Sequence, residues 1–105
     1  MQAVLDLDSI QDLHLVGINT INVKGDWIYP PKEVVFSVSD DGNTFKEVYK
    51  QTAFAQQGIN KVRGRLQQVR GRYVKVQMQN YGRIPAGAAG AGNPAWLFAD
   101  EFIVE

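Results

Sequence analysis

The sequence contains no cysteine and only one histidine, His14, in 105 residues. Without cysteine the chain can form neither a disulfide framework nor a cysteine-based zinc site. A serine or threonine nucleophile needs a neighbouring base, most often histidine. His14 stands between Leu13 and Leu15 in an expected strand, so we interpret it as structural.

Long apolar runs are also missing. A membrane-spanning helix needs about 20 mainly apolar residues, whereas the apolar runs here are a few residues long. The N-terminus lacks the charged start, apolar stretch and cleavage site of a signal peptide. We therefore expect no membrane span and no targeting signal in this sequence, and a single domain covering residues 1–105.

Acidic residues are absent from the middle of the chain, between Glu47 and Asp100, although the net charge is zero. The basic residues of that segment are Lys50, Lys61, Arg63, Arg65, Arg70, Arg72, Lys75 and Arg83. Such a segment can bind an acidic polymer or a membrane surface, or it can pair with neighbouring acidic strands. The balanced total favours pairing, and the lack of a basic helix argues against a nucleic-acid partner.

Short segments rich in Val, Ile, Tyr and Phe alternate with turn residues, which predicts an all-β protein. Residues 33–39 alternate in polarity and precede Asp40-Asp41-Gly42-Asn43, so we expect a hairpin with residues 45–50. Arg70-Gly71 predicts a second hairpin. The further expected strands are residues 4–7, 13–23 (with a bulge or break), 62–69, 72–80 and 97–104. About seven strands favour an antiparallel β-sandwich.

Carboxylate pairs could hydrolyse glycosidic bonds. Asp40-Asp41 has the composition of a turn, and the side chains of Asp100-Glu101 would point to opposite faces of a strand. The glycines after residue 82 lead into a strand rather than a helix, which disfavours a phosphate-binding loop. We therefore predict no catalytic residues.

Two long connections, residues 24–32 and 81–96, carry aromatic rings, and the second contains only Ala and Gly from 86 to 92. A ring at a loop tip can stack on the apolar face of a sugar while Arg, Asn or Asp side chains bind its hydroxyls. The predicted carbohydrate-binding residues are Asp26, Trp27, Tyr29, Tyr81, Arg83, Asn93 and Trp96. Alternatively, the rings cap the ends of the sandwich as part of the core.

Several segments resemble the discoidin, or coagulation factor five/eight type C, family. Residues 36–45 are similar to its "S-x-DG-x-x-W/F" hairpin, residues 72–76 to its "RYV" strand, and residues 4–7 to its "VDLG" strand. More narrowly, residues 27–34 and 95–101 resemble the C-terminal modules of bacterial family-20 glycoside hydrolases, the chitobiases and β-N-acetylhexosaminidases.

This resemblance implies a galactose-binding-like jelly roll that lacks the family's first strand. It implies a non-catalytic module of a secreted, periplasmic or extracellular, glycosidase that binds a terminal hexose or N-acetylhexosamine. The alternative is a structural module that docks on the catalytic domain of the parent enzyme. No cofactor is required, although Glu101 matches a position from which relatives offer a carboxylate to a structural calcium ion, whose other ligands would lie in the missing segment.

Overall fold

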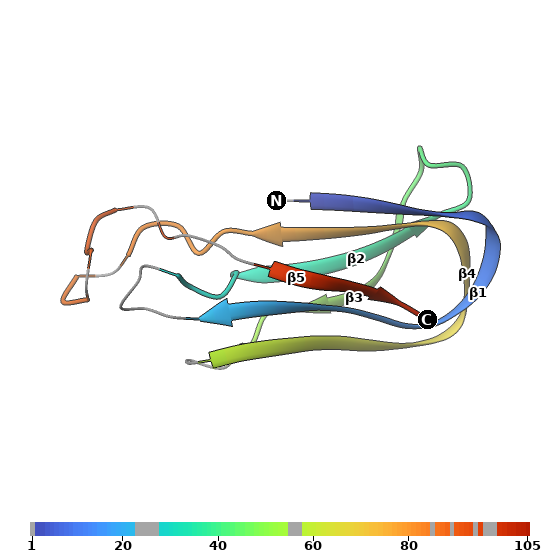
Figure 1. Ribbon diagram of the computed structural model, residues 1–105. Helices are drawn as coiled ribbons and strands as arrows, with labels where there is room; N and C mark the ends of the chain where they lie inside the picture. Colours follow the sequence, from blue (N-terminus) through green and yellow to red (C-terminus); the bar gives the residue numbers. More distant parts are fainter. Residues whose placement is uncertain are drawn as a thin grey trace.

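In the part of the chain that the structure describes, five antiparallel strands form one continuous sheet (Figure 1). The computed structural model describes residues 2–22, 28–54, 58–84, 86–88, 90–93, 95 and 99–105. The strands are β1 (Gln2–Asn22), β2 (Glu33–Ser39), β3 (Lys46–Gln51), β4 (Gly58–Gln79) and β5 (Ala99–Val104), in the order β3-β2-β4-β1-β5. The prediction of an all-β antiparallel fold is confirmed. Within the described residues, no helix is long and apolar enough to cross a membrane.

The sheet folds over on itself because its two longest strands, β1 and β4, bend together at one end (Figure 1). In one layer, residues 2–6 of β1 pair with residues 73–77 of β4, and β2 and β3 extend this layer. In the other layer, residues 16–22 of β1 pair with residues 58–64 of β4, and β5 extends it. The strands thus form two layers of one sheet, where two separate sheets were expected.

Bulges create the corner at which β1 and β4 bend. Pairing passes from Asp6↔Tyr73 to Gln11↔Gly71, so four residues of β1 face one residue of β4. A second shift in register lies further along, between residues 13 and 15 of β1. Extra residues of this kind bend a strand and increase its twist. Asp8 in the first bulge has a positive φ of 69° and donates its amide to Asp6 Oδ1 at 2.8 Å.

The hairpin predicted at Arg70-Gly71 does not form. Both residues lie within β4, where they pair with Asp12 and Gln11 of β1. A Cβ added at Gly71 would lie 3.2 Å from Cβ of Val38, so glycine allows β4 to approach β2 closely. This glycine therefore marks a close approach between strands rather than a turn.

The main core fills the space between the two layers. Phe36 of β2 is completely buried, and its ring centroid lies 6.1 Å from that of Phe102 in β5 and 6.3 Å from that of Tyr49 in β3. Val34 and Val38 of β2 are buried as well. Burying one such side chain contributes about 1.5–3 kcal/mol.

The hairpin predicted between β2 and β3 is confirmed, and Asp41 organises its turn. Asp41 Oδ1 accepts hydrogen bonds from the amides of Asn43 at 2.8 Å and Thr44 at 3.0 Å. Ser39 Oγ donates to the same oxygen at 2.9 Å and accepts from the amide of Gly42 at 2.9 Å. The amide of Thr44, then that of Asn43, and the Ser39 hydroxyl lower the pKa of Asp41 to about 2.

Candidate functional site

Connections at the end of the sheet opposite the corner form a small apolar cluster separate from the main core (Figure 1). Its buried members are Tyr29, Ile84 and Ala95, and Tyr81 packs against them. The rings of Tyr29 and Tyr81 lie 4.7 Å apart between centroids and are tilted by 37°. Tyr29 is only 2% exposed, whereas Tyr81 is partly exposed. Tyr29 therefore supports Tyr81 from behind and does not offer its own ring to a ligand.

Tyr81 lines a shallow cavity of about 240 Å³. The other lining residues are Pro30, Pro31, Lys32, Thr52 and Phe54. Phe54 contributes a second partly buried ring, and the exposed Lys32 and Thr52 contribute hydrogen-bonding groups. An apolar wall with a few polar groups is the usual composition of a small-molecule site.

Sequence reasoning did not identify Phe54, Thr52 or Lys32 as site residues. Thr52 and Phe54 belong to the segment between β3 and β4, for which the sequence analysis predicted neither a strand nor a site residue. A single aromatic residue among polar ones was the available signal. The fold, not the sequence order, brings this segment beside the connection that carries Tyr81.

Arg83 and Asn93, predicted to bind sugar hydroxyls, hold the Ala/Gly connection in shape. Arg83 Nη1 donates to the carbonyl of Gly92 at 2.7 Å, and Asn93 Nδ2 donates to that of Gly90 at 3.0 Å. The amide of Ile84 also donates to the carbonyl of Asn93 at 2.9 Å. Both side chains are exposed, and neither lines the cavity beside Tyr81.

Asn80, another residue that sequence reasoning missed, joins the two ends of the 81–96 connection by hydrogen bonds. Its Nδ2 donates to the carbonyl of Ala95 at 3.2 Å, and its Oδ1 accepts from the amide of Gly82 at 2.8 Å. The amide of Ala95 in turn donates to the carbonyl of Gly82 at 2.7 Å. The remaining predicted site residues, Asp26, Trp27 and Trp96, lie outside the described residues.

Glu101, the predicted calcium ligand, lies at a bulge of β5 and has a positive φ of 53°. Its Oε2 accepts a hydrogen bond from Asn19 Nδ2 at 3.1 Å, and Asn19 Oδ1 accepts one from Arg63 Nη2 at 2.9 Å. A calcium ion needs six to eight oxygen ligands, whereas the contact recorded for Glu101 is with an amide nitrogen. In the described part of the chain, no group of three or more His, Asp or Glu side chains could hold a metal.

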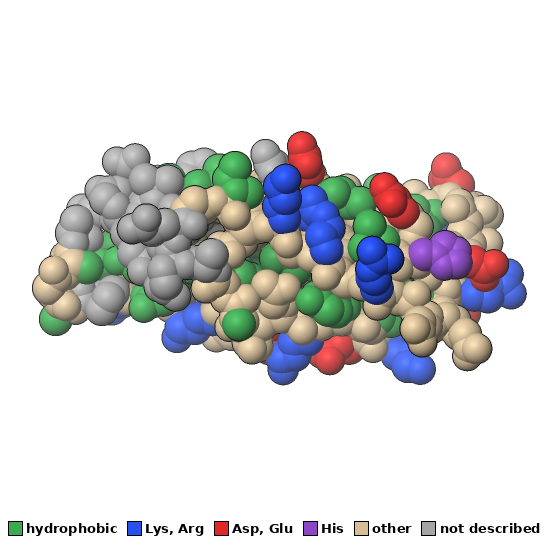
Figure 2. Space-filling view, turned by 90° about the horizontal axis from the view of Figure 1, so that it is seen from below, with side chains coloured by type: hydrophobic (Ala, Val, Ile, Leu, Met, Phe, Trp, Pro, Cys, Tyr) green, Lys and Arg blue, Asp and Glu red, His purple; other side chains and the backbone are tan. Residues whose placement is uncertain are grey.

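Two arginines of the basic segment pair with the acidic start of the chain. Arg70 Nε lies 3.0 Å from Asp12 Oδ1, and Arg72 Nε lies 2.8 Å from Asp6 Oδ1. On the face drawn in Figure 2, basic and acidic side chains are interspersed rather than gathered by sign. The pairing interpretation of the uneven charge is therefore confirmed for these two arginines, which leaves less basic surface for an acidic polymer or membrane.

The folded sheet and its end connections define an all-β antiparallel domain, and a solved structure has a similar fold. This is the C-terminal domain of a chitobiase from Bacteroides fragilis, with a TM-score of 0.51 and 16% sequence identity. The similarity covers 99% of this chain but only 64% of that one. No known family matches the sequence, and neither does any curated protein. At this low identity, the similarity shows a shared fold.

Proposed function

We propose that this chain is a non-catalytic carbohydrate-binding module of a secreted bacterial glycosidase of the chitobiase or β-N-acetylhexosaminidase type. In the same proposal we assign it to the discoidin-like jelly rolls. The fold similarity to a chitobiase C-terminal domain supports this assignment, as do the hairpin and strand motifs named above. The parent enzyme would act in the periplasm or outside the cell.

The cavity beside Tyr81 is the observation that carries the proposal. Tyr29 packs behind the Tyr81 ring, so the ring loses little freedom when a ligand stacks on it. Phe54 provides a second apolar surface, while Lys32 and Thr52 can bind hydroxyls. A cavity of about 240 Å³ suits one terminal hexose or N-acetylhexosamine. We expect weak affinity, which attachment to an enzyme that acts on the same glycan would increase.

An NMR titration of the ¹⁵N-labelled chain with N-acetylglucosamine and with galactose tests this proposal. We expect shifts at the amides of Lys32, Thr52, Phe54 and Tyr81. Replacing Tyr81 with Ala should weaken binding about tenfold, equivalent to about 1.4 kcal/mol, whereas Tyr81→Phe should keep most of it. The control is Phe45→Ala, which removes a partly buried ring from the β2–β3 turn, away from the cavity.

Two results would overturn this assignment of the site. One is an absence of shifts with both sugars at high concentration. The other is binding that Tyr81→Ala leaves unchanged, which would remove the cavity from the site. Trp27→Ala in the same titration would then report whether the ligand contacts the 24–32 connection instead.

Docking on the catalytic domain is the second candidate, because one strand edge is open and apolar. Residues 2–6 of β1 pair with β4 on one side, and no other described strand pairs with their other side. Val4 and Leu5 are 51% and 39% exposed there. If the module docks through this edge, Val4→Lys should weaken its calorimetric binding to the isolated catalytic domain and leave the sugar titration unchanged.

A further inference from the structure

A larger cavity lies at the corner of the folded sheet, at the opposite end from Tyr81. Its volume is about 380 Å³, within the usual range for ligand pockets. The lining residues come from β2, β3 and the bent part of β4. A smaller cavity of about 190 Å³ adjoins it, sharing Val38, Lys46 and Arg70.

The lining of this corner cavity combines an apolar floor with a polar, positively charged rim. Val38 and Leu66 are buried, and Val48 and Val69 are partly buried. The exposed side chains around them are Lys46, Glu47, Arg65, Gln67, Gln68 and Arg70. Apolar groups beside amide and guanidinium donors can bind one face of a sugar ring together with its hydroxyls.

The charges of the corner cavity favour a ligand with one negative charge. Arg70 already pairs with Asp12. Across the described residues, neither Lys46 nor Arg65 has a carboxylate within ion-pairing distance. Within the corner cavity itself, these two unpaired cations and the carboxylate of Glu47 leave about one positive charge, which a carboxylate balances and a doubly charged phosphate exceeds. The carboxylate of Asp40 lines only the adjoining smaller cavity.

The backbone at the rim is held in an unusual conformation. Gln68 has a positive φ of 54° and lies within the register shift that turns β4 around the corner. Non-glycine residues with strained backbone conformations cluster at functional sites. Here it accompanies the turn that places Arg65 and Arg70 around one cavity.

We propose that the corner cavity is a second binding site, for an acidic sugar of the hexuronate class. The carboxylate lies between Lys46 and Arg65, the amides of Gln67 and Gln68 bind ring hydroxyls, and the apolar floor contacts the ring. This site is independent of the one beside Tyr81, so the module can contact two parts of a glycan that carries both neutral and acidic residues.

An NMR titration with glucuronate, with glucose and acetate in parallel, tests the proposal on the intact chain. We expect glucuronate to shift the amides of residues 46–48 and 65–70 at millimolar concentration. Glucose lacks the charge and acetate lacks the ring, so each should bind at least about fivefold more weakly. Equal binding of acetate would overturn the sugar assignment, and equal binding of glucose would overturn the role of the charge.

Three variants complete this test. Arg65→Gln should weaken glucuronate binding about threefold to tenfold. The control Lys61→Gln removes the same charge from an exposed residue of β4 that does not line the cavity, and should have little effect. Asp12→Asn frees Arg70 and should strengthen binding. Equal losses in Arg65→Gln and Lys61→Gln would indicate general charge attraction and overturn the site.

Discussion

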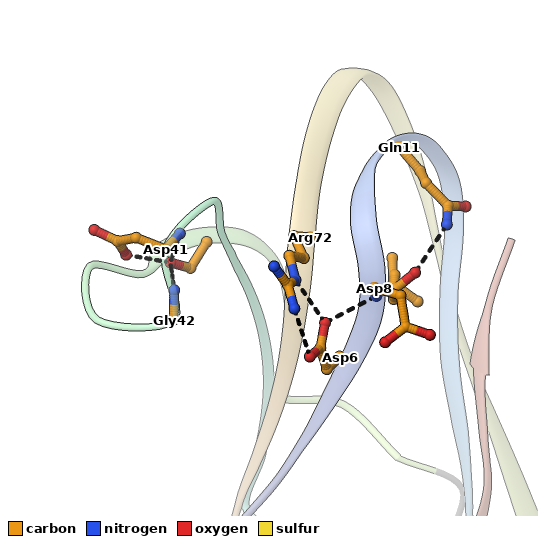
Figure 3. Close-up of polar contacts among 8 residues, drawn as sticks. Asp6, Asp8, Gln11, Asp41, Gly42 and Arg72 are labelled. Atoms are coloured by element: carbon orange, nitrogen blue, oxygen red, sulfur yellow. Dashed lines mark hydrogen bonds and ion pairs between the residues drawn. The ribbon is translucent and has the colours of Figure 1, made fainter.

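Asp6 and Arg72 form a bidentate ion pair beside the corner of the sheet, although they are 66 residues apart in sequence. Arg72 Nε donates to Asp6 Oδ1 at 2.8 Å, and Arg72 Nη2 donates to Asp6 Oδ2 at 3.0 Å (Figure 3). The amide of Asp8 donates to the same carboxylate. One side chain of β1 thus holds β4 and the first bulge together. The hydrogen bond from Arg72 is the main reason that the pKa of Asp6 is lowered.

Asp6→Asn should destabilise the fold, because it removes the charge from this pair and weakens the bond to the bulge. The loss should shrink at high salt, which screens partly exposed charges. Asp12→Asn is the matched control, since Asp12 makes a single contact with Arg70 and is more exposed. Urea denaturation measures the free energy of unfolding of both variants. A larger loss of stability in Asp12→Asn than in Asp6→Asn would contradict the assigned role of Asp6.

Asp41 should make stability depend on acidic pH. Its pKa in the folded chain is about 2, below the ordinary value of 3.8. A lowered pKa means that the folded state favours the charged form, so the stabilisation is present above the ordinary pKa and is lost as pH falls towards about 2. The Asp41→Asn variant does not titrate, so its stability should fall less between pH 5 and pH 2. If the stability of the wild type depends on pH in the same way as that of the variant, this prediction is wrong. Figure 3 shows Asp41 and Gly42 in the turn.

Gly64→Ala should destabilise the protein by about 1–3 kcal/mol, the usual cost of overpacking a core. A Cβ at Gly64 would overlap the ring of Tyr49, which packs directly against this glycine. Tyr49→Leu removes the ring that the new Cβ would overlap. Gly64→Ala should therefore cost less stability when it is added to Tyr49→Leu than when it is added to the wild type. Denaturant unfolding measures all three variants. Wild-type stability in Gly64→Ala would show that the two layers are not packed closely here.

The open edge of β1 should make the isolated chain associate with a second copy as its concentration rises. Unpaired strand edges with apolar side chains pair readily with other chains, and a lysine on the edge prevents this. Val4→Lys should therefore reduce association in sedimentation experiments. The control Gln77→Lys adds the same charge to a residue of β4 that pairs on both sides. Association that responds equally to both variants would place the contact elsewhere.

Local patterns predicted the local parts of this fold. Residues 33–39 alternate in polarity and precede an Asp-Gly turn, and β2 and the hairpin form there. The long strands β1 and β4 were instead each divided into shorter ones, and in β4 the reason was that Arg70-Gly71 predicted a turn. The bulges that bend them contain Asp8 and Gln68, whose positive φ angles have no signature in sequence. One folded sheet therefore replaced the expected pair of sheets.

The candidate site was predicted less completely, because its residues meet only in the folded chain. Tyr81 was identified as an aromatic residue in a long connection, and it does line a cavity. Tyr29 has the same local character, yet packing alone decides that it is the buried ring of the pair. Phe54 was missed since nothing in its polar neighbourhood indicates that β3 ends beside Tyr81. The pairing of charges was predictable from the zero net charge.

The long-range pairing of β1 with β4 determines how the chain must be assembled. Gln2 and Gln77, which face each other in the sheet, are 75 residues apart. Because β1 precedes β4 in the chain, residues 16–22 have no partner in β4 until residues 58–64 follow, and residues 2–6 have none until residues 73–77 follow. Folding of such distant strands is slow, and the apolar residues of β1 are exposed to other chains in the meantime. The pairing that joins both layers therefore also slows folding and favours aggregation of chains in which β4 is not yet complete.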